Sequence, residues 1–231
     1  MRAFVLAAGL GTRIRPLFPD LPKSLIPIRG KPFIHWQIQR LADQGFRDVV
    51  VCIGYRAAQI KEYCKDGSRW GVSLQYSEEH EPQGTATTLQ SARALLSSVS
   101  LVLNGDTHLP ADYRALVNDH TKEAEARETI ASIALVSKPK HEGSGRVMLD
   151  AHDRITTFME KASDQEQGLV NAGAYVVEPA ILHSIPSGPS SLERDIFPQL
   201  AQSGLLHGIT LSCDFTDIGT PEGYAALESA L

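Results

Sequence analysis

Apolar strands alternate with amphipathic helical segments along the first half of this chain, and that alternation restricts the fold more than any other feature. Residues 3–8 form a continuous apolar run, and residues 49–53 form another after a segment with helical spacing. Strands that are apolar throughout are typical of parallel sheets covered by helices on both faces. The elements expected in this half are strands at 3–8, 49–53, 72–76 and 101–103 and helices at 32–45 and 85–96.

The second half of the chain has a less regular pattern, with short apolar runs separated by polar stretches. A chain of 231 residues is long enough for one well-buried domain and short for two. We therefore expect a single α/β domain over residues 1–231, built as a three-layer α/β/α sandwich with a mainly parallel mixed central sheet. The further expected elements are strands at 130–136, 145–149, 155–158, 170–177 and 208–211, loops at 137–144 and 161–168, and a terminal helix from Thr220.

Charge is distributed unevenly along the chain. The formal net charge of -5 argues against a nucleic-acid-binding protein, because such proteins usually carry a basic footprint. Residues 1–31, in contrast, carry six basic residues and one acidic residue, Asp20. A local positive site in an acidic body suits a small polyanion such as a nucleotide, although a solvated basic face would give the same count.

Composition also indicates the compartment. No apolar run approaches the ~20 residues that cross a bilayer, and the amino-terminal apolar stretch runs into glycines, unlike a signal sequence. The widely spaced Cys52, Cys64 and Cys213 indicate neither a disulfide framework nor a zinc site. We expect a cytoplasmic protein that binds neither membranes nor nucleic acid. Its oligomeric state is open, and a homo-oligomer is compatible with the sequence.

A glycine-rich loop follows the first predicted strand. In an open parallel sheet, ligands bind beyond the carboxyl ends of the strands, so this loop is a candidate site. Gly9 and Gly11 would let backbone N–H groups approach phosphate oxygens, and Arg13 would add a bidentate cation. Ile14 excludes the dinucleotide-binding motif G-x-G-x-x-G, and the G-K-[ST] of a P-loop is absent. The glycine pair alone is also compatible with a simple tight turn.

A longer string gives this loop a specific meaning. Residues 6–17, LAAGLGTRIRPL, are followed by PKSLIPI at 22–28 and by GKP at 30–32. This combination resembles the signature of the sugar-phosphate nucleotidyltransferase family, whose members have a Rossmann-like fold and join a nucleoside monophosphate from an NTP to a sugar 1-phosphate. The resemblance covers nearly the whole chain. It departs from the usual pattern at Phe18 and Ser24, which should shift loop packing more than chemistry.

The resemblance implies which residues bind the nucleotide. Arg13 would hold the departing pyrophosphate, and Lys23 would contact phosphate near the reacting centre. The string EPQGTA at 81–86 resembles the family's base-reading loop, although a turn followed by an N-cap would have the same residues. The implied nucleotide-binding residues are Leu6, Ala7, Ala8, Gly9, Gly11, Thr12, Arg13, Lys23, Pro82, Gly84, Thr85 and Asp106.

Two aspartates far apart in the sequence are the candidate metal ligands. Asp106 follows the predicted strand 101–103, and Asp217 lies in the string DFTDIGTP near the end of the chain. A carboxylate facing a triphosphate would be repelled unless a divalent cation stood between them, although a lone strand-end aspartate is more often a cap or turn residue. The resemblance implies that Asp106 and Asp217 bind Mg²⁺, with Asp214 as the less well-fitting alternative. This hypothesis requires the two carboxylates to lie close together beside Gly11.

The site for the acceptor sugar phosphate is assigned through the resemblance alone. It implies a nucleotide-binding half at about 1–110 and a sugar-phosphate-binding half at about 111–231. Lys161 would contact the sugar phosphate; without the resemblance, Glu160 and Lys161 would be an ordinary charged pair. The implied sugar-phosphate-binding residues are Gly145, Glu160, Lys161, Asn171 and Gly173, with Ala172 where glycine is more usual.

The implied reaction is in-line attack of a sugar-phosphate oxygen on the α-phosphorus of the NTP, with release of pyrophosphate and no protein nucleophile. Such transfers depend on positioning and charge neutralisation. The cofactor would be Mg²⁺, and the implied catalytic residues are Arg13, Lys23, Asp106, Lys161 and Asp217.

Substrate choice is the least constrained step. The motifs are most similar to those of D-glycero-α-D-manno-heptose 1-phosphate guanylyltransferases, which would make GTP the nucleotide and GDP-heptose for bacterial capsule or lipopolysaccharide the product. Uridylyl-, thymidylyl- and mannose 1-phosphate guanylyltransferases are alternatives. A non-catalytic nucleotide-sugar-binding regulatory subunit is the alternative from another class, whereas Ile14 disfavours a nicotinamide-dependent oxidoreductase.

Overall fold

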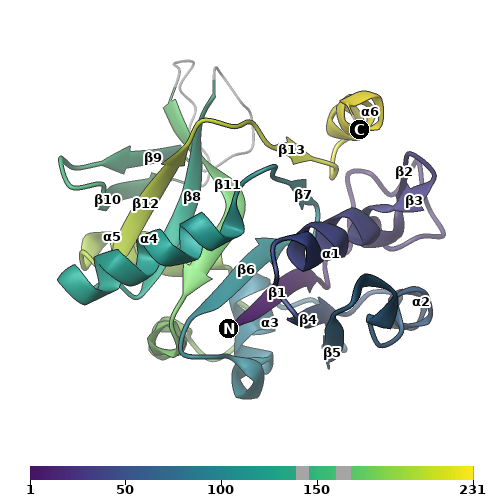
Figure 1. Ribbon diagram of the computed structural model, residues 1–231, viewed down its shortest axis with the longest axis horizontal. Coiled ribbons are helices and arrows are strands. Elements are labelled where there is room, and N and C mark those ends of the chain that lie inside the picture. The colour runs from purple at the N-terminus through teal and green to yellow at the C-terminus, as the bar shows by residue number, and fades with distance from the viewer. Residues whose placement is uncertain (139–145, 160–167, 231) are drawn as a thin grey trace.

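One mixed sheet organises the chain (Figure 1). The computed structural model describes residues 1–138, 146–159 and 168–230. Within these residues, nine strands form a sheet in the order β10–β9–β11–β6–β1–β4–β5, and β8 joins β12 to β11. The strands are Arg2–Ala7 (β1), Asp48–Ile53 (β4), Ser73–Glu78 (β5), Ser100–Asn104 (β6), Ala131–Lys138 (β8), Arg146–Leu149 (β9), Ile155–Met159 (β10), Gly168–Val177 (β11) and Leu206–Leu211 (β12).

The sheet has a parallel part and an antiparallel part. β6, β1, β4 and β5 run parallel, and Leu6 of β1 pairs with Cys52 on one side and Asn104 on the other. β11 runs antiparallel to β6 and extends the sheet to β8 and β9. The predicted mainly parallel, mixed sheet is confirmed. Because parallel strands end at one edge, the residues that follow β6, β1, β4 and β5 form a row along that edge.

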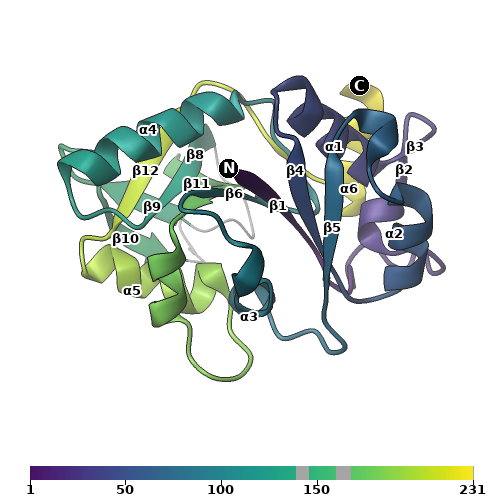
Figure 2. The same cartoon turned by 60° about the horizontal axis from the view of Figure 1, so that its bottom comes forward.

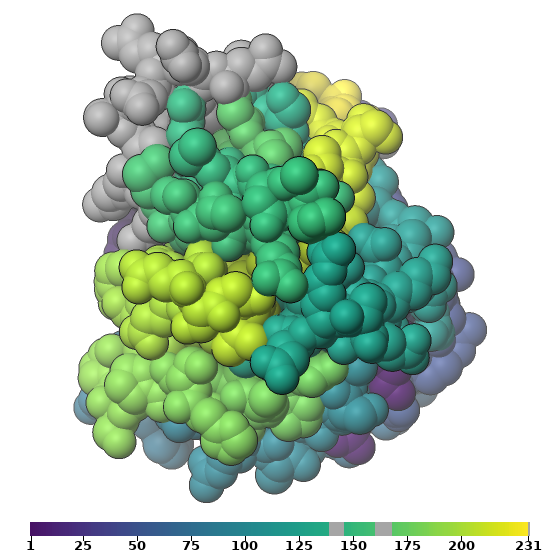
Figure 3. Space-filling view, turned by 90° about the vertical axis from the view of Figure 1, so that its left-hand side faces the viewer, coloured from purple at the N-terminus to yellow at the C-terminus, as the bar shows by residue number. Residues whose placement is uncertain are grey.

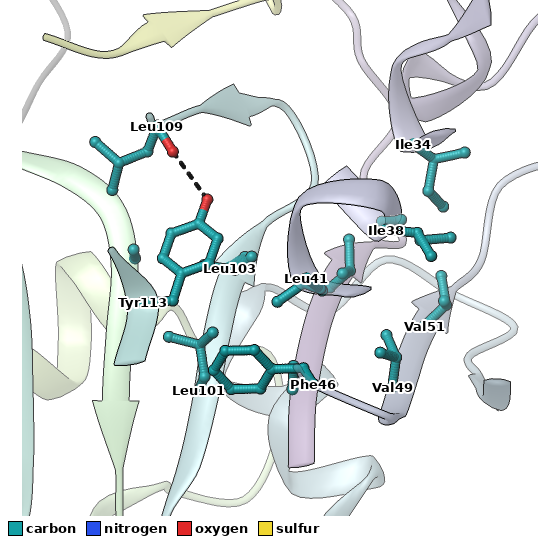
Figure 4. Close-up of a cluster of buried hydrophobic side chains, with 14 of the residues drawn as sticks. Ile34, Ile38, Leu41, Phe46, Val49, Val51, Leu101, Leu103, Leu109 and Tyr113 are labelled. Atoms are coloured by element: carbon teal, nitrogen blue, oxygen red, sulfur yellow. Dashed lines mark hydrogen bonds between the residues drawn. The ribbon is translucent and has the colours of Figure 1, made fainter. Parts of the chain in front are cut away.

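Helices cover both faces of the sheet and complete the three predicted layers (Figure 2). On one face, Ile34, Ile38 and Leu41 share a buried hydrophobic cluster with Val49 and Val51 of β4 (Figure 4). Each such buried side chain contributes about 1.5–3 kcal/mol. Alternate residues of each strand supply separate hydrophobic clusters on the two faces. The helices are α1 (Phe33–Asp43), α2 (Ala57–Cys64) and α4 (Tyr113–Ala126) on this face, and α3 (Thr85–Ser91) and α5 (Phe197–Gln202) on the other.

The end of the chain packs against its beginning. β7 (Thr107–His108) pairs with β13 (Thr216–Asp217), and α6 (Pro221–Ala230) follows, as predicted for the terminal helix. Ile218 and Leu227 are buried with Ile28 and Phe33 in a third hydrophobic cluster. Figure 1 shows α6 beside the hairpin of β2 (Pro27–Ile28) and β3 (Lys31–Pro32). The β7–β13 pair therefore brings the far end of the chain to the residues that follow β6.

Some element boundaries differ from the prediction. The helix expected over 85–96 ends at Ser91, and a 3-10 turn over Arg93–Leu95 follows because the N–H of Ala92 is shared between two preceding carbonyls. Ser137 and Lys138, expected in a loop, belong to β8, and Gly168, expected in the second loop, begins β11, because these residues pair across the two strands. The remaining parts of the two predicted loops, 139–144 and 161–167, and the first residue of the strand predicted at 145–149 lie outside the described residues.

Three helices, α2, α4 and α5, were not predicted from the sequence pattern. In the described ranges, every helix is too short or too polar to span a bilayer.

Candidate active site

The candidate site lies where β1 and β6 end. The backbone N–H of Gly105 donates to the carbonyl oxygen of Leu6 at 3.0 Å, so the chain leaving β6 runs directly against β1. A Cβ atom at position 105 would lie 2.5 Å from that oxygen, which is too close for any side chain. Glycine is required there because it lets two backbones approach closely. This packing places the next residue, Asp106, beside the loop that follows β1.

Lys23 lies between the two predicted metal-binding aspartates. Its Nζ donates to Oδ2 of Asp106 and lies 3.7 Å from Oδ1 of Asp217. Only 13% of its side chain is exposed. A Cβ atom at Gly11 would lie 3.0 Å from the Lys23 Cβ, so the glycine-rich loop packs on the stem of this lysine. One ammonium group thus joins both aspartates beside Gly11, as the metal hypothesis requires.

Asp217 is fixed by the backbone around it and by a second cation. The backbone N–H of the next residue donates to the carbonyl oxygen of Asp106 at 2.9 Å. The Asp217 Oδ1 accepts from the N–H of Gly219 at 2.7 Å, and its Oδ2 accepts from Nη2 of Arg13 at 3.2 Å. Arg13, Lys23, Asp106 and Asp217 therefore form one group, called here the carboxylate–cation cluster.

Asp214, the alternative metal ligand, has different partners. Its Oδ1 lies 2.8 Å from Nζ of Lys138, and 78% of its side chain is exposed. The Asp217 side chain is 28% exposed and contacts both cations of the cluster. The geometry favours Asp217.

Electrostatics keep Asp106 ionised. Burial raises the pKa of its carboxyl group, but the charge of Lys23 and hydrogen bonds from Lys23 and Thr107 lower it more, so the net pKa lies below the ordinary value. Two nearby carboxylates would repel each other without positive charge between them. Lys23 and Arg13 supply that charge in this structure.

The two aspartates fit a magnesium site. Among the described residues, no group of three or more His, Cys, Asp or Glu side chains could hold a metal. Mg²⁺ needs fewer protein ligands, because it commonly keeps several waters and binds through one or two carboxylates together with substrate phosphates. The Lys23 ammonium already lies between Asp106 and Asp217, so this position accommodates positive charge.

A cavity of about 350 Å³ opens beside the cluster. Seven of the predicted nucleotide-binding residues line it: Leu6, Ala8, Gly9, Pro82, Gly84, Thr85 and Asp106. The other lining residues were not among the predicted site residues: Glu79, Thr88, Asn104, Gly105 and Glu193. Asn104 and Gly105 directly precede the predicted Asp106. The cavity therefore joins the glycine-rich loop, the predicted base-reading loop and the end of β6.

Other predicted nucleotide-binding residues lie outside the cavity lining. Gly11, Arg13 and Lys23 belong to or adjoin the carboxylate–cation cluster. Thr12 is exposed in the turn after β1. Ala7 is buried in the hydrophobic cluster of the face that α1 covers, so only its backbone could reach a nucleotide.

The predicted base-reading loop packs against a distant segment of the chain. Gly84 has a positive φ of 96°, and a Cβ atom there would lie 2.3 Å from the carbonyl oxygen of Ser190. That same oxygen accepts the N–H of Ala86 at 3.1 Å, at the start of α3. The Thr85 hydroxyl donates to Oε2 of Glu193 at 2.6 Å. Close approach at Gly84 thus serves the protein's own backbone, and it places Glu193 of the distant segment in the cavity wall.

The predicted acceptor residues are only partly described. Gly145, Glu160 and Lys161 lie outside the described residues. Asn171 donates from Nδ2 to the Tyr175 hydroxyl at 2.9 Å and accepts the N–H of Gly173 at 2.9 Å, so both ends of its amide bind the protein itself. Gly173 has a positive φ of 70°, at the register shift of β11. A Cβ atom at Gly173 would lie 2.8 Å from Oγ1 of Thr107, which places β11 against the residues that follow β6.

Comparison with known proteins identifies the family. The nucleotidyl transferase family pattern matches residues 2–231. The chain belongs to the nucleotidyl transferase family. The resemblance inferred from the LAAGLGTRIRPL string is therefore confirmed.

Individual proteins that are similar to this nucleotidyl transferase support the same family assignment. The mannose-1-phosphate guanylyltransferase catalytic subunit beta of Drosophila melanogaster is 34% identical over 227 residues, which are 96% of this chain and 60% of that protein. The structure of HddC from Yersinia pseudotuberculosis complexed with GMP-PN is 26% identical, with a TM-score of 0.84 over 99% of this chain and 98% of that one. A putative glucose-1-phosphate thymidylyltransferase from Bacillus anthracis, 22% identical with a TM-score of 0.88 over 100% of this chain and 94% of that one, shows the same fold.

The cluster should be essential for nucleotidyl transfer. We expect Lys23→Ala and Asp106→Ala each to lower turnover at least about 100-fold, because each removes a preorganised charge from the reacting centre. Steady-state pyrophosphate release measures the effect, and circular dichroism verifies folding. Lys61→Ala is a matched control, since it removes only a solvent-exposed pair with Glu78. Near-normal turnover by a folded Lys23 or Asp106 variant would contradict the assignment.

Proposed function

We propose that this protein transfers GMP from GTP to a sugar 1-phosphate and releases pyrophosphate. The observation that carries the proposal is the carboxylate–cation cluster at the mouth of a cavity lined by the glycine-rich loop. Membership of the nucleotidyl transferase family supports the reaction class, and the mannose-1-phosphate guanylyltransferase and HddC comparisons support a guanine nucleotide. The chain spans about 60% of the length of the curated relative in Drosophila, so activity and substrates are proposed for this domain itself.

The cluster contains the groups that nucleotidyl transfer needs. Backbone N–H groups after β1, together with Arg13 and Lys23, would bind the phosphate oxygens and neutralise charge on the departing pyrophosphate. Asp106 and Asp217 would hold Mg²⁺, which when bound adds positive charge against the phosphate oxygens. Lys161 would bind the phosphate of the acceptor sugar. No side chain of the protein need act as a nucleophile, since the sugar phosphate supplies the attacking oxygen.

Glu79 supports guanine as the base. It follows β5, and its Oε2 accepts from the Thr88 hydroxyl at 2.8 Å, the one side-chain hydrogen bond to this carboxylate among the described residues. Three strand spacings, roughly 14 Å, separate β5 from β6, which leads to Asp106. The Glu79 side chain lies on the β4–β5 side of the cavity, where it packs beside Gly54. Guanine presents two adjacent donors, N1–H and the 2-amino group, to one carboxylate. The uracil and thymine edges present a single donor, N3–H, flanked by two carbonyl oxygens that a carboxylate repels.

For the acceptor we propose a sugar 1-phosphate of manno configuration. The motif pattern favours D-glycero-α-D-manno-heptose 1-phosphate, whose product, GDP-heptose, would serve bacterial capsule or lipopolysaccharide synthesis. Mannose 1-phosphate is the second candidate, because the curated relatives are mannose-1-phosphate guanylyltransferases. The two acceptors share the ring configuration and differ in the exocyclic chain.

A substrate panel tests the proposed function. Wild-type protein with Mg²⁺ is incubated with GTP, UTP, dTTP, CTP or ATP and with mannose, heptose, glucose or galactose 1-phosphate, and pyrophosphate release is measured. We expect the highest kcat/KM for GTP with a manno-configured acceptor. Turnover with another pair would show that the substrates differ from those proposed, while the proposed type of reaction would stand. Nucleotide or nucleotide-sugar binding without turnover for any pair would instead indicate a regulatory subunit.

Glu79→Gln should weaken guanine recognition. Losing a charged acceptor should raise the KM for GTP about 10-fold or more and narrow the preference for GTP over UTP. Burial raises the pKa of Glu79 more than its Thr88 hydrogen bond lowers it, so the side chain takes up a proton at higher pH than an ordinary glutamate. The wild-type KM for GTP should therefore rise as pH falls through this raised pKa, whereas the Glu79→Gln profile should be flatter.

The neighbouring Glu78→Gln is the control, because Glu78 pairs with Lys61 and does not line the cavity. If Glu79→Gln and Glu78→Gln left the GTP preference equally unchanged, Glu79 would not read the base.

A further inference from the structure

Glu193 is a cavity carboxylate that the proposed function leaves without a role. Among the described residues, the carboxylates that line the cavity are Glu79, Asp106 and Glu193. Asp106 belongs to the carboxylate–cation cluster, and Glu79 is assigned to the base. Glu193 lies on a π-helical turn, Leu192–Ile196, between β11 and α5. Figure 3 shows the chain segment that leads into this turn as the light green surface at the bottom of the view.

Hydroxyl groups hold the Glu193 carboxylate in one orientation. Its Oε1 accepts from the Tyr175 hydroxyl at 2.9 Å. Its Oε2 accepts from the Thr85 hydroxyl at 2.6 Å and from the Ser191 hydroxyl at 2.8 Å. These donors come from β11, from the start of α3 and from the turn itself. The carboxylate is therefore preorganised at the cavity wall by neutral donors.

The direction of each hydrogen bond at Tyr175 is determined by this carboxylate. An ionised carboxylate can only accept, so the Tyr175 hydroxyl must donate its one proton to Glu193. Its lone pairs then accept from Nδ2 of Asn104 at 3.1 Å and from Nδ2 of Asn171 at 2.9 Å. The ring is fully buried and packs against Phe197 with centroids 5.0 Å apart. The Tyr175 hydroxyl behind Glu193 thus has one donated and two accepted hydrogen bonds.

The chemistry of Glu193 restricts what it can bind. A carboxylate has about four acceptor positions, and three protein hydroxyls use three of them. A negative group repels phosphate, so phosphate oxygens cannot be its ligand. In the proposed reaction the guanine donors are assigned to Glu79, and the donors that remain on the two substrates are the hydroxyls of their sugar rings.

We infer that Glu193 binds a sugar hydroxyl, either of the ribose of the nucleotide or of the acceptor sugar. The inference rests on the proposed function, since it takes its substrates from that reaction. Glu193 lies between Thr85 of the base-reading loop and β11, which carries the predicted acceptor residues Asn171 and Gly173. It is therefore placed where the nucleotide and acceptor sides of the pocket meet. A site that hydrogen-bonds a hydroxyl in this way discriminates strongly against analogues that lack it.

Deoxy substrates test this assignment directly. The kcat/KM of wild type and Glu193→Gln is measured with GTP, 2′-deoxy-GTP and 3′-deoxy-GTP, and then with mannose 1-phosphate and its 2-, 3-, 4- and 6-deoxy analogues. We expect Glu193→Gln to lower kcat/KM about 10-fold or more with the full substrates. The ratio of kcat/KM for wild type to kcat/KM for the variant should fall to about 1 with the one analogue that lacks the bound hydroxyl. The arm in which this happens identifies the sugar.

Two further variants separate binding from structure. Tyr175→Phe keeps the buried ring but removes the donor that orients Glu193. It should therefore reduce the preference for the full substrate over the deoxy analogue, by a smaller factor than Glu193→Gln does. If Glu193→Gln does not fold, Tyr175→Phe provides the test. Asp195→Asn is the matched control, because Asp195 lies on the same turn, accepts from the Ser191 N–H and does not line the cavity. For Asp195→Asn, the ratio of wild-type to variant kcat/KM should be equal for all analogues.

The outcomes are distinguishable. A Glu193→Gln penalty that is equal for every deoxy analogue, or no penalty at all, would overturn the assignment while leaving the proposed function intact. Absence of turnover by the wild type with GTP and every sugar 1-phosphate would overturn the proposed function and this assignment with it.

Discussion

The arrangement of the site depends on one ammonium group shared by two carboxylates. Lys23 contacts Asp106 directly and lies 3.7 Å from Asp217, while Arg13 completes the pairing on the other side of Asp217. Two neighbouring, partly buried carboxylates would repel each other strongly here without compensating charge. The requirement explains why the end of the chain returns to its start: the β7–β13 pair and the packing of α6 bring Asp217 to Asp106. The same positive charge is what a polyphosphate needs.

The cavity is assembled from segments that are distant in sequence. The Ser190 carbonyl oxygen accepts N–H groups at the start of α3, and Gly84 is the residue that permits this contact. Glu193 and Tyr175 extend the connection to β11 and to Asn104 at the end of β6. Backbone contacts and buried hydrogen bonds thus hold the start of α3, β11 and the end of β6 in fixed relative positions. Preorganisation of this kind is the main source of rate in reactions that rely on charge neutralisation.

Sequence patterns predicted the parts of this protein that are locally encoded. The apolar runs of β1, β4 and β6 are typical of buried strands in a parallel sheet. The glycine-rich loop and the strings around Arg13, Lys23, Asp106 and Asp217 match a family motif. Helix α4 was not predicted, because its buried positions are few and one of them is occupied by a polar residue, His120. Glu79 and Glu193 have no motif around them, and their place in the cavity depends on strand order and on contacts between remote segments. For the same reason, sequence could not show that both ends of the Asn171 amide bind the protein itself.

The most direct test of the central claim is a double-mutant cycle between the two aspartates. If Asp106 and Asp217 act together on one shared cation, removing either one disables the same unit. Pyrophosphate release is measured for Asp106→Asn, Asp217→Asn and the double variant, each verified as folded. The account predicts that the double variant is within about threefold of the slower single variant, since strongly coupled residues are non-additive. Penalties that multiply in the double variant would show that the two carboxylates act independently, and would contradict the account.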